Sequence, residues 1–363
     1  MMRAMPTTGA ALLASALLAL ALLALALNQS AFAQSSAPRP PAAKPNRVAA
    51  PGEKTAPAAP ADPPPDMAYG AFQRGYFITA FTLATDRVTN DADPKAMTLL
   101  GELYAEGLGV PQDDRRAAEW YRLAAARGDS NAMFALAMFA LNGRAGPRDR
   151  DASTRWLAAA AKLGHPLAAY DLALLYIEGQ MFPQDFSRAA ELLRIAAQGG
   201  SADAQYALGT FYKTGRGVPQ DARQAAQWWA KAALADNTDA QVEYAIALFN
   251  GEGVDRNEEA ATALFRKAAM RGGAIAQDRL ARILASGRGA PRDLAEATKW
   301  HLISRAGGET DLELDDVINK LDPQTRAAGE KAAKPWLDAI EAARKAQAAA
   351  QQAPPPQAAP AKR

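Results

Sequence analysis

The sequence contains no cysteine and only two histidines, His165 and His301, among its 363 residues. The lack of cysteine excludes disulfides, thiol chemistry and cysteine-ligated zinc or iron–sulfur sites, and it is compatible with an oxidising compartment. The two histidines stand far apart in the sequence, so no paired-histidine zinc motif exists. We therefore expect no metal and no cofactor, and we interpret both histidines as surface or packing residues.

The chain also lacks an excess of charge of either sign. It has 41 Lys and Arg residues against 39 Asp and Glu residues, which leaves a formal net charge of +2. Such a balance gives no electrostatic reason to expect a nucleic acid as partner. We therefore drop the nucleic-acid interpretation.

The N-terminus has the pattern of a secretory signal peptide. Arg3 precedes the apolar run Gly9 to Leu27, and "AFAQ" at 31–34 offers an Ala-x-Ala cleavage site after Ala33. We expect residues 1–33 to be removed on export to the periplasm. The apolar run is nearly long enough to span a bilayer, so an uncleaved anchor in the inner membrane, facing the periplasm, is the alternative. Membrane contact is expected only through this segment.

Two segments are too rich in Pro and Ala to bury a core. Residues 34–66 ("SAPRPPAAKP", "APAAPADPPPD") are predicted to be a disordered linker, and residues 350–363 a disordered tail. Between them, residues 67–92 are predicted to form an N-terminal helical cap and residues 309–349 C-terminal capping helices, which give the terminal layers a polar outer face.

The middle of the chain repeats with a fixed step of 36 residues. "LGELYAEGLGVPQD" at 100–113 returns as "LGTFYKTGRGVPQD" at 208–221. Six units share this register: 93–128, 129–164, 165–200, 201–236, 237–272 and 273–308. One position of the repeat is glycine in every unit: Gly107, Gly143, Gly179, Gly215, Gly251 and Gly287. A repeat of this length predicts stacked supersecondary units.

Each unit is predicted to form two short helices, A and B. In the first unit the apolar spacing indicates helix A from Lys95 to Glu106, and Gly107 suits the left-handed residue that ends a helix. Asp113 is predicted to cap helix B, as are its equivalents Asp149, Asp185, Asp221, Asn257 and Asp293. In helix B we expect the large side chains Trp120, Trp156, Leu192, Trp228, Leu264 and Trp300 to fill the space between layers. Replacing the buried Trp228 by alanine should then cost about 3–5 kcal/mol.

These motifs resemble the Sel1-like repeat family, a relative of the tetratricopeptide repeats. The fourth unit matches the family pattern nearly throughout, from "AQYALGTFYKTGRGVPQD" at 204–221 to "ARQAAQWWAKAA" at 222–233. The resemblance covers the six units and implies an all-α fold, a right-handed α-solenoid of helix–turn–helix repeats. It also implies a scaffold that binds another protein or peptide.

We found no motif that supports catalysis. The recurring "GLGV", "GRGV" and "GEGV" hinges lack the Gly-Lys-Ser/Thr ending of a phosphate-binding loop. Some cysteine-rich relatives are linked to penicillin binding or hydrolysis, but this chain has no cysteine and no Ser-x-x-Lys motif. We predict no catalytic residues and no enzyme activity. A β-lactam- or peptidoglycan-acting enzyme is a remote alternative.

In related tetratricopeptide arrays, ligands lie in the concave groove lined by helices A. The equivalent positions are Thr98, Glu102 and Ala105 in the first unit and Asp278, Arg282 and Ala285 in the sixth unit. In the fourth unit one of the three positions is Thr210. The candidate partner-binding groove consists of the remaining positions: Phe134, Met138, Leu141, Tyr170, Leu174, Ile177, Tyr206, Lys213, Val242, Ile246 and Phe249.

Two interpretations of this mostly apolar stripe stay open. It packs between adjacent helices as intramolecular core, or it is an exposed patch that marks a partner-binding groove. We predict an adaptor or regulator of the bacterial cell envelope, because exported relatives include negative regulators that bind a sensor kinase. The alternative is an envelope structural or peptidoglycan-associated protein.

Overall fold

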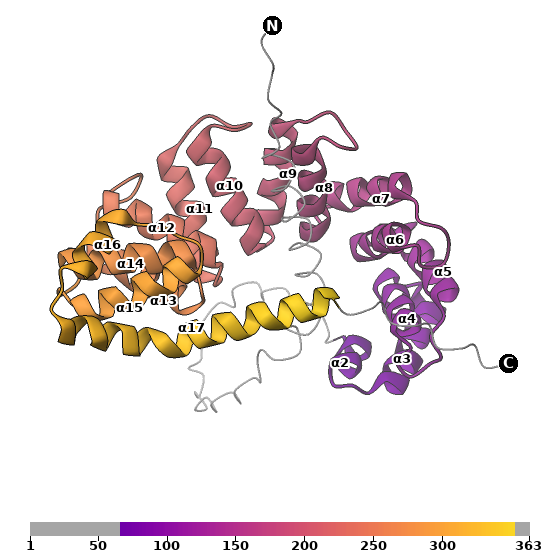
Figure 1. Cartoon of the computed structure of the whole chain (residues 1–363). Helices are drawn as coiled ribbons and strands as arrows, with labels where there is room; N and C mark the ends of the chain where they lie inside the picture. The colour runs from indigo at the N-terminus through magenta and orange to yellow at the C-terminus, as the bar shows by residue number, and fades with distance from the viewer. Residues whose placement is uncertain (1–65, 353–363) are drawn as a thin grey trace, which may run out of the picture. The chain divides into compact units, whose positions relative to one another are not determined.

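The computed structural model describes residues 66–352, and all the regular elements within this range are α-helices (Figure 1). The predicted signal peptide, most of the linker and all but the first residues of the predicted tail lie outside the described residues. No helix in the described range is long and apolar enough to cross a membrane. The helices are α2 (Met67–Gln73), α3 (Phe77–Asp91), α4 (Pro94–Glu106), α5 (Asp114–Ala125), α6 (Ser130–Asn142), α7 (Arg150–Lys162), α8 (Pro166–Glu178), α9 (Phe186–Gln198), α10 (Ala202–Thr214), α11 (Ala222–Leu234), α12 (Thr238–Asn250), α13 (Glu258–Met270), α14 (Ala274–Ser286), α15 (Leu294–Ala306), α16 (Leu312–Asn319) and α17 (Pro323–Gln352).

The six repeats form an all-α solenoid, as predicted. Helix A of each unit is an even-numbered element from α4 to α14, and helix B is the element that follows it. Helices A and B pack on one another within a unit, and helix B also packs on helix A of the next unit (Figure 1). Each apolar helix face is therefore covered by neighbours in the chain, which is the physical basis of a solenoid.

The turn between helices A and B has the predicted chemistry. All six glycines that follow helix A have a positive φ, between 67° and 78°, where a Cβ would be strained. The acidic residue before helix B caps it: Asp113 Oδ1 accepts from the backbone N–H of Arg115 and Arg116, each at 3.0 Å. Asn257 caps α13 in the same way, through Ala260 N at 2.9 Å. The recurring Gly and Asp are therefore structural.

The prediction that Trp228 is the buried ring of helix B is wrong. Trp229 is only 2% exposed, whereas Trp228 is half-buried and carries the Lys231 ammonium 3.9 Å from its ring centroid. Alanines 225, 226, 232 and 233 are also buried, so the inward face of α11 passes through Trp229. The neighbouring position is buried in every unit: Tyr121, Leu157, Leu193, Trp229, Phe265 and His301.

The glycine of the "LG" motif makes room for this inward ring. A Cβ on Gly209 would lie 2.6 Å from Trp229, and one on Gly101 would lie 2.5 Å from Tyr121. Units whose inward residue is Leu, Phe or His carry alanine instead, as at Ala245 opposite Phe265. A smaller helix A residue therefore stands opposite a larger inward residue on helix B, because the two elements share a fixed packing volume.

Helices also flank the six units. At the N-terminal side, Met67 and Tyr69 of α2, Tyr76 before α3 and Ile78 of α3 are exposed. At the C-terminal side, the long helix α17 packs along α15 (Figure 1). Its Trp336 ring meets the Trp300 ring with centroids 5.6 Å apart. The last repeat is therefore covered by a helix from outside the array.

Candidate partner-binding face and its charged pocket

We use the name helix A face for the eleven candidate groove residues predicted above, which all lie on α6, α8, α10 and α12. Nine of them are partly buried, Leu141 is 41% exposed and Val242 is 8% exposed. Phe134, Met138, Tyr170 and Ile177 pack against the apolar core between α6 and α11, and Ile246 and Phe249 pack against the core that follows. The face is therefore the open edge of the core between layers.

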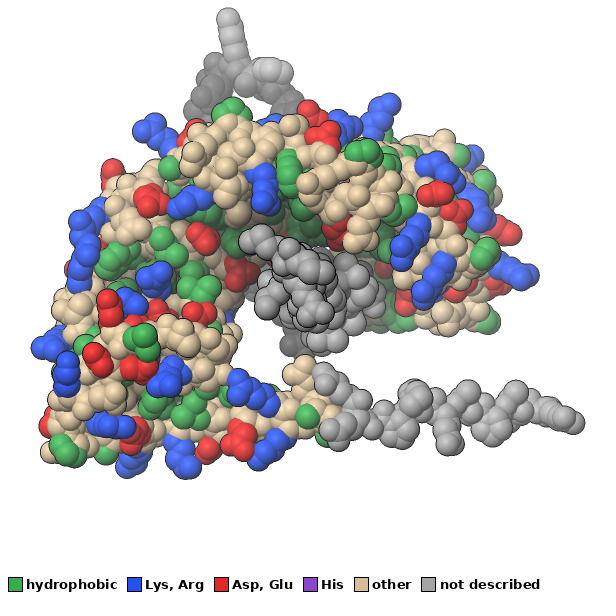
Figure 2. All heavy atoms as spheres, turned by 45° about the horizontal axis from the view of Figure 1, so that its top comes forward, with side chains coloured by type: hydrophobic (Ala, Val, Ile, Leu, Met, Phe, Trp, Pro, Cys, Tyr) green, Lys and Arg blue, Asp and Glu red, His purple; other side chains and the backbone are tan. Residues whose placement is uncertain are grey.

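Aromatic side chains on this face are held by their neighbours. The Phe134 ring stacks on His165, with centroids 4.7 Å apart. Burial, followed by the charges of Asp203 and Asp171, raises the pKa of Tyr170 to about 12. Hydrophobic side chains lie among acidic and basic ones over the described surface (Figure 2). A face of this kind offers rigid rings with polar groups beside them.

Two acidic residues that the sequence analysis did not consider lie one position beyond the predicted stripe. Burial raises the pKa of Asp171 to about 6, and the pKa of Glu243 is also raised, chiefly by burial. Other units carry Leu99, Ala135 or Ala207 at this position. The signal that could have revealed Asp171 and Glu243 is a charged residue at a repeat position that is apolar in three other units.

Lys213 is engaged within the solenoid. Its ammonium lies 2.7 Å from Glu252 and 5.8 Å from the centroid of the Trp229 ring. The ion pair links the end of α10 to the hinge of the next unit. Lys213 is therefore less available to a partner than its place on the stripe predicts.

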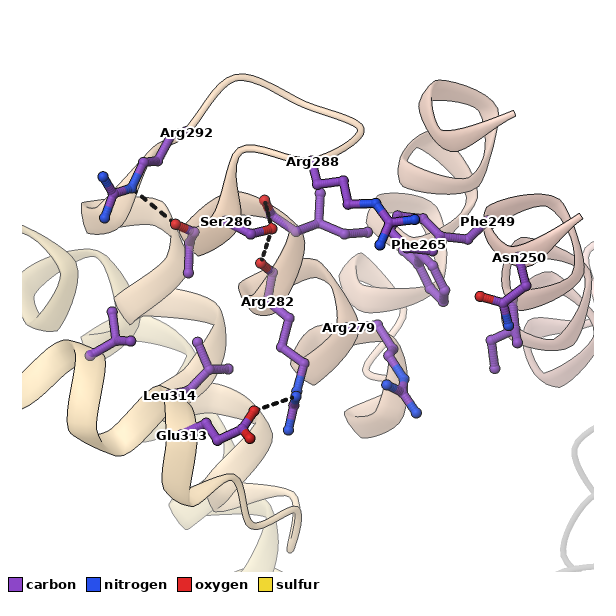
Figure 3. Close-up of a pocket in the computed structure, with 14 residues that line it drawn as sticks. Phe249, Asn250, Phe265, Arg279, Arg282, Ser286, Arg288, Arg292, Glu313 and Leu314 are labelled. Atoms are coloured by element: carbon purple, nitrogen blue, oxygen red, sulfur yellow. Dashed lines mark hydrogen bonds and ion pairs between the residues drawn. The ribbon is translucent and has the colours of Figure 1, made fainter. Parts of the chain in front are cut away.

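A pocket of about 560 Å³ lies at the C-terminal end of the helix A face, between α12, α14 and α16 (Figure 3). Ile246 and Phe249 of the predicted groove line it, together with Arg282 and Ala285. The buried ring of Phe265 contributes from α13. The sequence analysis did not find this pocket, because α16 comes from outside the repeats.

Four arginines line the pocket, and two of them are neutralised by acids of the chain. Arg282 Nε lies 2.5 Å from Asp311 Oδ2 and Arg282 Nη1 lies 3.2 Å from Glu313 Oε2. Arg288 donates through Nε to Glu258 Oε1 at 2.9 Å and lies 4.6 Å from the Phe249 ring centroid (Figure 3). Arg279 and Arg292 form no ion pair with any residue in the described range. Two arginines of the lining therefore stand outside the described ion pairs, and one of them, Arg279, interacts with the charge of the neighbouring Asp278.

Arg292 also has a structural role. Its Nε donates to the carbonyl of Ala285 at 3.0 Å, at the end of α14. In other units a glutamine makes the same bond, as Gln220 does to Lys213 O at 2.9 Å. The hinge therefore needs one side-chain donor here, which Arg292 supplies (Figure 3).

Both histidines are packing residues. His165 caps α8, and its Nδ1 accepts from Ala168 N at 3.1 Å. His301 is 1% exposed, and its Nε2 lies 2.8 Å from Asp315 Oδ1 on α16. No group of three or more His, Cys, Asp or Glu residues that could hold a metal ion occurs in the part of the chain that the structure describes.

Helical hairpins stacked along the chain define this protein as an α-solenoid repeat protein. The Sel1 repeat model matches residues 94–129, 130–165, 166–201, 202–237, 238–273 and 274–308, more than half of the chain. The chain therefore belongs to the Sel1 repeat family. Members of this family are generally non-catalytic scaffolds for protein–protein interactions.

A solved structure agrees with this assignment. A Sel1 repeat protein from Oxalobacter formigenes is 29% identical, with a TM-score of 0.52, covering 66% of this chain and 98% of its own. A protective antigen of uropathogenic Escherichia coli strains is 24% identical, with a TM-score of 0.49, over 79% of this chain and 69% of its own. A comparison with curated proteins found no match.

Proposed function

We propose that this protein binds another protein or a peptide through the helix A face, as an adaptor or regulator of the bacterial cell envelope. The observation that carries the proposal is the row of partly exposed apolar and aromatic side chains over four consecutive units. Half-buried rings supply contact area at a low cost in conformational entropy, as in the anchors of protein interfaces. The row ends at the charged pocket, which adds polar groups to the same face.

The location of the protein is part of this proposal. The signal-peptide pattern in residues 1–33 supports export to the periplasm, with cleavage after Ala33. Mass spectrometry of the chain isolated from fractionated cells tests it. A periplasmic chain that begins at Gln34 supports cleavage, a membrane-bound chain that keeps residues 1–33 supports the anchor, and a cytoplasmic chain overturns export.

The binding proposal is tested by crosslinking in intact cells, followed by capture of the tagged full chain. The variant replaces Tyr170, Tyr206 and Phe249 with serine. We expect one envelope protein to be recovered with the wild-type chain and lost with the variant. Capture of only membrane and wall material would favour the structural alternative.

The control must separate lost binding from lost folding. Tyr212 lies on α10, as Tyr206 does, but its hydroxyl accepts from Arg194 of α9 at 3.3 Å. Tyr212→Ser therefore removes a half-buried ring from the same helix without changing the helix A face. Equal recovery of the partner by the wild-type chain and the folded triple variant would refute the proposal.

A further inference from the structure

We propose that the partner presents a basic side chain, lysine or arginine, to the helix A face beside Tyr170, where Asp171 and Asp203 accept its charge. This inference rests on the proposed function, because it states the chemistry of the partner at the middle of that face. We use the name tyrosine–aspartate row for Tyr170 and Asp171 of α8, Asp203 and Tyr206 of α10, and Asp239 of α12.

The two tyrosines of this row have the same charge environment, one repeat apart. Burial, followed by the charges of Asp203 and Asp171, raises the pKa of Tyr170 to about 12. Burial, followed by the charge of Asp239, also raises the pKa of Tyr206. Asp203 and Asp239 are each the second residue of a helix A, so each acts on the tyrosine of the preceding unit. The row therefore brings partly buried rings and carboxylates together on three successive helices A.

No cation of the described residues neutralises the carboxylates of this row. Asp171, Asp203 and Asp239 form no ion pair with any described residue. One oxygen of Asp203 accepts from the neutral side-chain amide of Asn237 at 2.9 Å. Lys213 of the helix A face is already paired with an acid of the next unit, as described above. The row therefore presents negative charge beside its rings.

Elsewhere in the array the chain fills such an arrangement with a cation of its own. Arg288 lies 4.6 Å from the Phe249 ring centroid, and its Nε donates to Glu258 at 2.9 Å. Lys213 is held in the same way, between a ring and a carboxylate. The ring attracts the cation through its quadrupole, and the carboxylate adds a charge-assisted hydrogen bond. A basic side chain of the partner would complete the equivalent arrangement at Tyr170.

Packing does not require the acid at Asp171. Ala135 and Ala207 stand at the same repeat position, and burial raises the pKa of Asp171 to about 6, so its ionised form costs stability near neutral pH. The helix dipole favours acids in the first turn, which accounts for Asp203 and Asp239. Asp171, however, is the sixth residue of α8. A carboxylate whose burial opposes folding is typical of a functional site.

Isothermal titration calorimetry with defined peptides tests the proposal on the purified full chain. The basic probe is acetyl-Gly-Leu-Lys-Ser-Phe-Lys-Gly-amide, whose Leu and Phe supply apolar contacts and whose blocked ends carry no charge. The neutral peptide carries Gln at both lysine positions, and the acidic peptide carries Glu there. The three peptides therefore differ only at the two positions that set the charge.

We expect the basic peptide to bind roughly tenfold more tightly than the neutral peptide, because a charge-assisted hydrogen bond is about twice as strong as a neutral one. The double variant Asp171→Ala with Asp203→Asn should lose this preference. It should stay folded, as circular dichroism would show, because the second unit carries Ala135 and Asn131 at these two positions.

A matched control separates the acids of the row from the net charge of the chain. Glu119→Gln with Asp151→Asn removes the same charge from exposed positions of α5 and α7. This control should prefer the basic peptide as the wild type does. A preference lost equally in the control and in the double variant would show a general charge effect and overturn the proposal.

Binding of the neutral or acidic peptide as tightly as the basic one would overturn the proposal, as would a basic preference that survives in the double variant. Absence of binding by all three peptides would overturn it as well. Basic-peptide binding that appears only after replacement of Arg39, Lys44, Arg47 and Lys54 with glutamine would assign the row to the chain's own N-terminal segment and overturn a partner as its occupant.

The crosslinking experiment distinguishes these results from failure of the proposed function. We expect the partner to be lost with the Asp171 and Asp203 double variant and retained by the matched control. A partner that is lost with the tyrosine and phenylalanine variant but retained by the double variant would show that the helix A face binds without these acids.

Discussion

At the scale of single residues, the inward position of helix B is buried in every layer. Trp229 is 2% exposed and lies against Gly209, whose missing Cβ leaves room for the indole ring. Trp228, one residue earlier, has its ring half-buried beneath Lys231. Neighbouring tryptophans that look alike in the sequence therefore differ in what their removal costs.

We predict that Trp229→Ala lowers the free energy of unfolding by about 3–5 kcal/mol, as loss of a buried aromatic ring does. Trp228→Ala should cost about 1–2 kcal/mol, because its ring is only partly buried. Urea denaturation followed by circular dichroism measures both. Equal costs for the two variants would contradict the assigned facing of α11.

A second prediction concerns Asp171, whose pKa burial raises to about 6 from the usual 3.8. The folded state therefore binds this proton more tightly than the unfolded state, so stability falls as the pH rises through this window. Asp171→Ala, which restores the residue found at Ala135 and Ala207, should stabilise the protein at pH 7 by about 1–3 kcal/mol.

The test of the Asp171 prediction is a pair of thermal melts of the wild type and the variant across pH 4 to 7. The two melting temperatures should converge at the acidic end and separate near neutrality. A constant difference at every pH would show that the carboxyl group does not titrate as its burial predicts.

At the scale of elements, each helix hairpin depends on the residue that begins helix B. Asp185 Oδ1 accepts from Arg188 N at 2.8 Å, and Asn257 makes the equivalent bond in the fifth unit. The side-chain oxygen, not the negative charge, is what the cap requires. The capping hydrogen bond at the start of helix B therefore does not depend on a negatively charged side chain.

We predict that Asp185→Ala lowers the free energy of unfolding by about 1 kcal/mol, the usual value for a lost N-cap. Asp185→Asn should lower it by only about a few tenths of a kcal/mol. Denaturant melts of the two variants measure the difference. If Asn were as costly as Ala, the carboxylate charge would have a role beyond capping.

At the scale of the whole array, stability is expected to be local, because each repeat contacts only its neighbours. The C-terminal layer is covered by α17, where a Cβ on Gly329 would lie 2.5 Å from Thr298 Cβ and 2.7 Å from Ala295 O. This close approach lets α17 lie along α15 and brings Trp336 onto Trp300. The last repeat therefore depends on a glycine outside the repeat pattern.

We predict that Gly329→Val displaces α17 and exposes α15, while the first four units keep their structure. Hydrogen exchange should accelerate in α15 and α17 and stay unchanged in α4 to α11. Ala332→Val, at an exposed position of the same helix, is the control and should leave exchange unchanged. Loss of protection throughout the array would instead indicate a single cooperative unit.

The sequence by itself determined the repeat, its helices, the Gly and Asp of each hinge and the family. These features depend on local backbone chemistry that returns every 36 residues, as at Gly107 and Asp113. The facing of Trp228 and Trp229 was mistaken, because adjacent residues on a helix differ by about 100° and the pattern alone allowed either to point inward.

Only the tertiary structure decided how the helix A face ends. The charged pocket combines α12 and α14 of the array with α16 from outside it, and no repeat-based alignment brings these elements together. The burial of Asp171 and the neutralisation of Arg282 by Asp311 likewise depend on contacts between helices. Pairings of this kind depend on distances between elements, which a periodic pattern does not contain.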